Sequence, residues 1–195
     1  MEKVLILASA SPRRQQLLKQ VNIPFTIRIP DIDESEIKTK DPMEKVTELA
    51  KRKGQAVPIS SSNEVILSAD TIVAFEEQIL EKPNNRVHAF EMISSLSGNI
   101  HDVYTGVCIR SENREKVFAE RTKVEFWPLK KEEIEAYIAT EEPYDKAGAY
   151  GIQHYGAIFV KQIIGDYFNV VGLPVSRVVR ELKQFGIYPN ITGDN

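Results

Sequence analysis

The side chains best suited to chemistry in this sequence are basic and acidic groups placed where short apolar segments end. Arg13 and Arg14 follow the apolar segment 4–8, and Asp70 follows a second apolar run of similar length. Guanidinium groups bind phosphate or carboxylate oxygens, whereas a carboxylate beside cations can orient water or a metal ion. The pattern therefore favours metal-assisted attack of water on an anionic substrate such as a phosphoanhydride.

The N-terminal segment predicts a buried strand over residues 4–8 that turns directly into a helix. Ser11 suits the N-cap position and Pro12 the first helical position. Arg13 and Arg14 then fall in the first helical turn, where the helix dipole normally favours acidic side chains. Either these arginines and the free backbone N–H groups bind an anion, or the arginines pair with acids that lie elsewhere in the chain.

A further basic side chain, Lys53, interrupts the apolar face of a predicted helix. That helix begins at Asp41 and Pro42, with Glu44 at its third position, and is expected to extend to about Val57. Its apolar stripe requires a buried residue at position 53, where the sequence has lysine. Lys53 either extends its alkyl stem along the core to reach water or has a functional role.

Residues 64–71 predict another buried strand, which ends in small polar residues and Asp70. In open α/β sheets, ligands gather at the carboxyl ends of the strands, so Asp70 is well placed for catalysis. The chain stays extended to about residue 75, and we expect Asp70 to lie at a bulge or bend. Lys82 follows the next hairpin and is expected to approach Asp70. Alternatively, Asp70 bonds to local backbone N–H groups.

Two polar segments are further candidates for a binding site. Residues 30–36 form an acidic loop in which Glu34 either faces solvent or meets the basic corner or a hard cation. Residues 141–156 are rich in glycine, alanine and tyrosine, and they include Gln153. Small residues allow close backbone approach, and an amide can recognise a planar group, so this segment favours a binding wall over a purely structural loop.

The remaining pattern predicts alternating strands and helices. Strands are expected at 25–29, 100–110 and 116–127, and a strand pair at 158–160 and 167–171. Helices are expected at 86–96 and 130–138 and from Pro174 to the Gly186 stop. Residues 189–195 predict a loose tail.

Composition excludes several classes of protein. The 195 residues carry a net charge of −3, and neither sign forms a long run, so a nucleic-acid surface is not indicated. One cysteine excludes an internal disulfide framework, and no segment has the length of a transmembrane helix. The short N-terminal apolar run precedes its arginines, the reverse of a signal peptide, which predicts a cytoplasmic protein.

Four separated motifs resemble the Maf family of nucleoside triphosphate pyrophosphatases. The motifs are Ser9-Ala10-Ser11-Pro12-Arg13-Arg14, Ala69-Asp70-Thr71, Lys82-Pro83 and Asp145-Lys146-Ala147-Gly148-Ala149-Tyr150-Gly151-Ile152-Gln153. The resemblance implies a mixed α/β fold similar to inosine triphosphatase, with an elongated sheet, flanking helices and two lobes around a cleft. Residues 1–188 would form this single domain. It also implies a divalent cation, Mg²⁺ or Mn²⁺, and a possible homodimer.

The motif details resemble the branch of the family that converts dTTP and UTP to monophosphate and pyrophosphate. Asp70 matches the proton acceptor, and Arg13, Thr71 and Gln153 match positions associated with substrate selection. Other active-site positions are matched by Ser9, Glu34, Lys53 and Lys82. The phosphates would be held by the cations Arg13, Arg14, Lys53 and Lys82. Glu34 and Asp70 would hold the metal ion and water.

Two points keep alternatives open. The family often has glycine after the glutamine of the fourth motif, whereas this chain has His154, which affects the expected loop shape and base selectivity. The family is also associated with inhibition of septum formation, so the alternative function is a non-enzymatic nucleotide-binding regulator of cell division.

Overall fold

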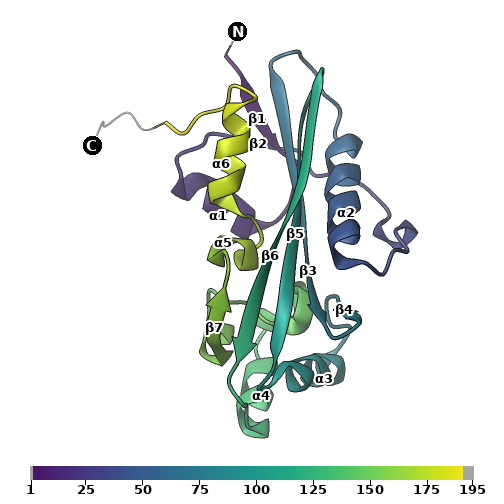
Figure 1. Cartoon of the computed structure of the whole chain (residues 1–195), viewed down its shortest axis with the longest axis vertical. Helices are drawn as coiled ribbons and strands as arrows, with labels where there is room; N and C mark the ends of the chain where they lie inside the picture. The colour runs from purple at the N-terminus through teal and green to yellow at the C-terminus, as the bar shows by residue number, and fades with distance from the viewer. Residues whose placement is uncertain (1, 191–195) are drawn as a thin grey trace. The chain divides into compact units, whose positions relative to one another are not determined.

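The first strand and the following helix form the corner predicted from the N-terminal segment (Figure 1). In the computed structural model, which describes residues 2–190, β1 covers Val4–Leu7 and α1 covers Pro12–Gln20. Leu17 and Leu18 of α1 are buried, as are the last three residues of β1. Ser11 occupies the N-cap position, but its side chain makes no capping hydrogen bond.

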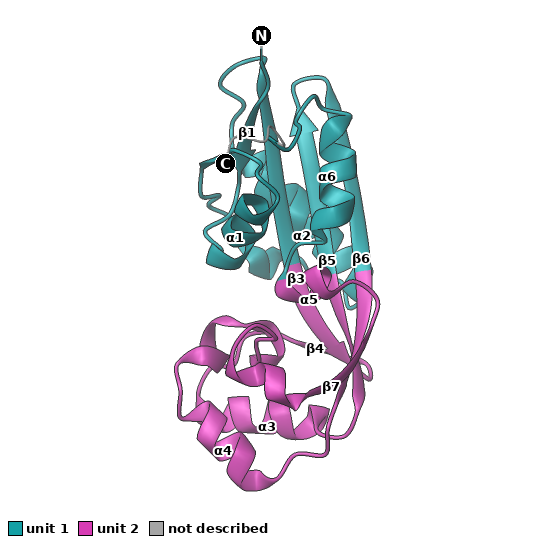
Figure 2. Ribbon diagram, turned by 90° about the vertical axis from the view of Figure 1, so that its left-hand side faces the viewer, with its two compact units in different colours: residues 1–70, 105–120, 172–195 teal, residues 71–104, 121–171 magenta. Residues whose placement is uncertain are grey.

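The strands β1, β2 (Thr26–Ile27) and β3 (Glu64–Phe75) are parallel, with β1 in the middle. Leu7 of β1 pairs with Ile27 on one side and Leu67 on the other. The chain thus moves from β1 to β2 through α1, then reverses across β1 to β3 through α2 (Pro42–Ala56). The two connections lie on opposite faces of these strands (Figures 1 and 2), as right-handed crossovers require when the direction reverses. The reversal makes the position between β1 and β3 a topological switch point, and α/β sheets bind ligands at the carboxyl ends of strands at such points.

The other elements complete a mixed α/β fold. The strand order of the seven-stranded sheet is β2-β1-β3-β5-β6-β7, and β4 pairs with β3. The remaining strands are β4 (Gln78–Leu80), β5 (Ile100–Ser111), β6 (Arg114–Phe126) and β7 (Val160–Ile164). The remaining helices are α3 (Arg86–Leu96), α4 (Lys131–Ile138), α5 (Tyr167–Val171) and α6 (Val175–Lys183), with 3₁₀ turns η1 (Glu34–Glu36), η2 (Glu142–Asp145), η3 (Ala147–Ala149) and η4 (Tyr155–Phe159). No helix within residues 2–190 is both long and apolar enough to cross a membrane.

The predicted strand pair near residues 158–171 is wrong. Residues 155–159 form η4, and β7 pairs with β6 instead, while residues 167–171 form the helix α5. The Asp166 carboxylate accepts a hydrogen bond from Phe168 N (2.8 Å), and Thr122 Oγ1 accepts one from Asp166 N (3.1 Å). These bonds start a helical turn because a short side chain substitutes for a backbone partner.

The strand expected at 25–29 shortens in the structure to the two residues of β2. β3 runs through Asp70 to Phe75 as one strand, and the expected bulge or bend at Asp70 stays a prediction. Of the predicted tail 189–195, Asn190 N donates to Asn22 O (2.8 Å), and residues 191–195 lie outside the described residues.

The chain divides into two compact units (Figure 2). Unit 1 contains residues 1–70, 105–120 and 172–195, and unit 2 contains residues 71–104 and 121–171. In unit 1, a buried cluster joins β1 and β3 to the end of α2 and consists of Ile6, Ala8, Val57 and Ile66. Unit 2 has its own core of aliphatic residues from α3 and α4 and of aromatic residues that include Phe126, Tyr150 and Phe159. Each unit therefore has buried apolar side chains to hold its polar residues in place.

Candidate active site

The β1–α1 corner holds Ser9 and Arg14 in fixed positions. Ser9 is 6% exposed, and its Oγ accepts hydrogen bonds from Ser11 N and Arg14 Nη1, both at 3.2 Å. Arg14 Nε also donates to the Gly172 carbonyl (2.9 Å). Burial lowers the pKa of the Arg14 guanidinium, against the opposing effect of Asp70 and with a contribution from neighbouring Arg13. Arg14 is thus tied to the backbone that precedes α6 and lies in the field of nearby charges.

One ammonium group joins two carboxylates beside this corner. Lys53 Nζ lies 2.5 Å from Asp70 Oδ1 and 2.8 Å from Glu34 Oε1. The side chains of Lys53 and Asp70 are 14% and 12% exposed, so their charges interact with little screening by solvent. Lys53 comes from α2, Asp70 from β3 and Glu34 from η1, so three separate segments of unit 1 build the cluster.

Local sequence explains how each of these segments is positioned. Asp41 Oδ1 accepts from Glu44 N (2.7 Å), so the predicted N-cap fixes the start of α2. Val46 and Leu49 bury the same face that carries Lys53, which directs the lysine inward. Asp33 Oδ1 accepts from Ser35 N (2.9 Å) and so caps η1, the turn that presents Glu34. The interruption of the apolar stripe by Lys53 is therefore explained by two carboxylate partners.

Glu34 and Asp70 could together contribute to a metal site. Their carboxylates converge on one point, the Lys53 ammonium, and oxygen donors of this type suit a hard divalent cation. Among residues 2–190 no group of three or more His, Cys, Asp or Glu side chains is arranged to hold a metal. Mg²⁺ commonly uses one or two carboxylates and completes its shell with water and substrate phosphates, so the donor set fits that ion.

Three predicted site residues belong to unit 2. Thr71 is the first residue of that unit and lies partly exposed on β3, directly after Asp70. Lys82 is exposed in the segment that follows β4, and its predicted approach to Asp70 stays a prediction. Gln153 is half-buried between η3 and η4, and its buried Oε1 has no hydrogen-bond partner among the described residues. An amide acceptor in this state is suited to receive a hydrogen bond from a ligand.

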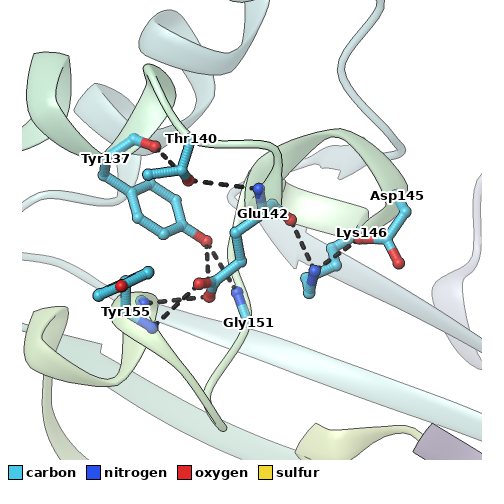
Figure 3. Close-up of polar contacts among 8 residues, drawn as sticks. Tyr137, Thr140, Glu142, Asp145, Lys146, Gly151 and Tyr155 are labelled. Atoms are coloured by element: carbon cyan, nitrogen blue, oxygen red, sulfur yellow. Dashed lines mark hydrogen bonds and ion pairs between the residues drawn. The ribbon is translucent and has the colours of Figure 1, made fainter. Parts of the chain in front are cut away.

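The segment that carries Gln153 is organised by residues that sequence reasoning did not single out (Figure 3). The Glu142 carboxylate accepts from Tyr155 N (2.9 Å), Gly156 N (3.1 Å) and the Tyr137 hydroxyl (3.1 Å). The Tyr137 hydroxyl in turn accepts from Gly151 N (3.2 Å). Most of these partners are backbone N–H groups, which every residue except proline has, so the residue types do not reveal the contacts. The only sequence signal for Glu142 is an acid placed before Pro143 in a glycine-rich segment.

A buried pair, His101 and Tyr150, connects the same segment to β5. His101 Nε2 shares a 2.8 Å hydrogen bond with the Tyr150 hydroxyl, and both rings pack edge-on against Phe126. Burial lowers the pKa of His101 to about 4, so the ring is neutral near pH 7. The scattered histidines of the sequence thus include one with a structural partner in the segment 141–156.

Comparison with known proteins identifies relatives along almost the whole chain. The family model described as Maf-like protein matches residues 4–185. A dTTP/UTP pyrophosphatase of Bacillus cereus is 52% identical over 185 residues, which cover 95% of this chain and 91% of that protein. A dTTP/UTP pyrophosphatase of Bacillus anthracis is 51% identical over 183 residues, which cover 94% of this chain and 96% of the relative.

A solved structure supports the fold class independently of these sequence matches. The structure of a HAM1 protein from Coxiella burnetii aligns with 94% of this chain and all of that chain, at a TM-score of 0.50 and 11% identity. At this identity the likeness concerns the fold alone. It confirms the mixed α/β class that was expected from the sequence.

Proposed function

Since the chain belongs to the Maf family, we propose that it is a hydrolase that splits dTTP and UTP into nucleoside monophosphate and pyrophosphate. Relatives at 51–52% identity are named dTTP/UTP pyrophosphatases, which supports this choice of substrate. The observation that carries the proposal is the cluster in which Lys53 contacts both Glu34 and Asp70. Cations and carboxylates at a β1/β3 switch point suit cleavage of a phosphoanhydride.

In the proposed reaction, Asp70 is the proton acceptor for the attacking water. The water oxygen forms a bond to the α-phosphorus, its proton passes to Asp70, and the bond from the α-phosphorus to the bridging oxygen breaks. The bridging oxygen leaves with the β- and γ-phosphates as pyrophosphate, taking up a proton from solvent when required. Lys53 holds the Asp70 carboxylate in place before the reaction and stabilises negative charge as the bond breaks.

The other site residues divide between the phosphates and the base. Arg13, Arg14 and Lys82 bind the phosphate oxygens, and Ser9 holds Arg14 in position. Thr71 and Gln153 recognise the base, and the unpartnered Oε1 of Gln153 supports this role because a pyrimidine N–H can donate to it.

Glu34 and Asp70 would hold a divalent cation, Mg²⁺ or Mn²⁺. Such an ion neutralises the phosphates and polarises the phosphoryl oxygens. We also propose that both units act within one domain spanning residues 1–188, that the protein works in the cytoplasm, and that it forms a homodimer. The single cysteine, Cys108, supports a reducing compartment.

A product assay tests the reaction. Purified protein is incubated with dTTP, UTP, CTP and purine triphosphates in Mg²⁺ or Mn²⁺, and the products are separated by ion-exchange chromatography. We expect dTTP and UTP to yield equal amounts of monophosphate and pyrophosphate, without a diphosphate intermediate. Chelation should abolish turnover, and added Mg²⁺ should restore it.

Two results would contradict the proposal. Sequential release of orthophosphate would place the cleaved bond elsewhere in the substrate. Nucleotide binding without turnover under any divalent cation would remove the enzymatic role and favour a nucleotide-binding regulator.

A further inference from the structure

The Glu142 carboxylate accepts several hydrogen bonds from the segment 151–156 and its surroundings. Its Oε1 receives the Tyr137 hydroxyl and Gly156 N, and its Oε2 receives Tyr155 N. Hydrogen bonds to a carboxylate are about twice as strong as those between neutral groups, because the acceptor carries a full charge. One side chain therefore fixes the backbone directly after Gln153 and His154.

Tyr137 extends this hold to the other end of the segment. Its hydroxyl donates to Glu142 and accepts from Gly151 N, two residues before Gln153. Burial, aided by the charge of Glu142, raises the pKa of Tyr137 well above its usual value, so the hydroxyl keeps the proton that it donates. Gly151 and Tyr155 are thus tied to the same pair of side chains (Figure 3).

The two ends of the segment also touch through glycine backbone. A Cβ added at Gly156 would lie 2.5 Å from Gly151 O, which is closer than real Cβ atoms approach. A Cβ added at Gly151 would lie 2.7 Å from Lys146 Cε, and Lys146 Nζ donates to the Glu142 carbonyl (2.6 Å). Residues 151–156 therefore form a closed loop, and Gln153 lies between its two fixed ends.

Gln153 needs such support because its own side chain has an incomplete set of contacts. Its buried Oε1 has no hydrogen-bond partner among the described residues. A buried, unpaired acceptor is unfavourable, and no hydrogen bond of this oxygen fixes the amide, so its position depends on the backbone that carries it. Recognition by hydrogen bonds also loses its selectivity when the recognising group is displaced by about 1 Å.

We propose that Glu142, together with Tyr137, is a positioning residue that fixes the loop 151–156 and thereby sets the base selectivity exerted by Gln153. This inference rests on the proposed base-reading role of Gln153. Glu142 acts through the loop and does not touch the nucleotide. Its removal should therefore change which base is preferred more than it changes the chemical step.

The main test measures base selectivity in single variants and then in a double-mutant cycle. Glu142→Gln keeps the size of the side chain but replaces one acceptor oxygen with an NH₂ group, and Tyr137→Phe removes only the shared hydroxyl. For either variant we expect the ratio of kcat/KM for dTTP over dATP to fall about tenfold, mainly through the KM for dTTP, within the range expected for a small misplacement. Glu141→Gln, the same change at an exposed neighbour, should leave the ratio unchanged.

The double-mutant cycle tests whether Glu142 affects base selectivity through Gln153. Gln153→Ala alone should lower the same ratio, and adding Glu142→Gln in that background should change it less than about twofold, because the two changes act on one interaction. A full additional loss in the Gln153→Ala background would overturn the inference, since Glu142 would then act by another route. An unchanged ratio in Glu142→Gln would also overturn it, even if that variant melted earlier.

Two further measurements separate this inference from the proposed reaction. Calorimetric binding of dTMP and dAMP measures the base preference without turnover. If the wild-type protein hydrolysed no nucleotide but its preference for dTMP depended on Glu142, the result would support this inference and overturn the proposed hydrolysis. Amide exchange at Tyr155 and Gly156 should accelerate in Glu142→Gln and not in Glu141→Gln. Unchanged exchange at both residues would contradict the positioning role.

Discussion

Lys53 Nζ lies 2.5 Å from Asp70 Oδ1, and the same nitrogen reaches Glu34 Oε1 at 2.8 Å. The side chains of Lys53 and Asp70 are both largely buried, so loss of the Lys53 charge leaves the Asp70 carboxylate without this ion pair in a poorly solvated site. Loss of the Asp70 charge leaves Lys53 with the more exposed Glu34 carboxylate alone. The pair joins a lysine on the inner face of α2 to a carboxylate within β3. Variants at this contact consequently test stability and activity together.

Asp70→Asn should lower turnover by roughly 10²-fold or more, the usual scale for a positioned acid–base group, while nucleotide binding largely survives. The change keeps the shape of the side chain and removes its charge. Steady-state kinetics and calorimetric nucleotide binding on the same preparation provide the measurement. Asp102→Asn, which breaks the exposed contact with Arg121 (2.8 Å), is the matched control and should retain normal turnover.

Comparable turnover in Asp70→Asn would exclude Asp70 as the proton acceptor. Circular dichroism must show that both variants are folded, because the lost partner of Lys53 also reduces stability. Loss of nucleotide binding together with turnover would show that Asp70 acts through binding of the substrate or the metal ion and not as the proton acceptor.

The two adjacent arginines of α1 should respond differently to alanine. Arg13→Ala should raise KM strongly and leave the melting temperature nearly unchanged, because it removes a phosphate contact from a helix start that gains by losing positive charge. Arg14→Ala should also lower the free energy of unfolding by about 2 kcal/mol, since its guanidinium bonds to Gly172 O and Ser9 Oγ. Kinetics and urea titrations of both variants distinguish the two effects. An early-melting Arg13→Ala with normal KM would make Arg13 structural.

His101 should make folding stability depend on pH between about 4 and 6.5. Burial lowers its pKa in the folded state to about 4 from 6.5, so in this interval the unfolded chain binds a proton that the folded protein does not. The stabilisation is complete above pH 6.5 and is lost as the pH falls toward 4. Between pH 7.5 and 4.5, wild type should lose about 2 kcal/mol more than His101→Gln, whose side chain does not titrate.

Urea titrations at the two pH values measure this difference. His154→Gln, at an exposed histidine, is the control and should lose stability as wild type does. If His101→Gln showed the same pH dependence as wild type, the buried His101 would not be the source of this loss of stability.

Gly106→Ala should be among the most destabilising single-methyl changes in unit 1. Its Cβ would lie 2.1 Å from the Val46 carbonyl oxygen, so the backbone of α2 would have to move away from β5. Overpacking of this kind costs about 3 kcal/mol or more when backbone must shift. At Gly54 the nearest atom is the Ser68 hydroxyl (2.7 Å), a side-chain atom whose displacement costs its hydrogen bond to the Ala50 carbonyl but no backbone shift, so Gly54→Ala should cost less in thermal unfolding. Equal losses would show that α2 adjusts freely.

The sequence by itself determined the elements whose signals lie within a few residues. Proline and a capping acid placed the start of α2, and a short apolar run followed by Pro12 placed the β1–α1 corner. The motifs also identified the family, because their order and spacing are written in the chain. Local rules succeed here because each signal and the structure that it sets are adjacent in sequence.

Tertiary structure decided the features that depend on distant partners. The helix α5 was mistaken for a strand because Asp166 is held by Thr122, 44 residues earlier in the chain. Lys53 had two open interpretations until folding brought Glu34 and Asp70 to its ammonium. The role of Glu142 was invisible because two of its partners are backbone N–H groups, which every residue except proline possesses. Such contacts depend on where the backbone lies in space, and residue types along the chain do not encode that position locally.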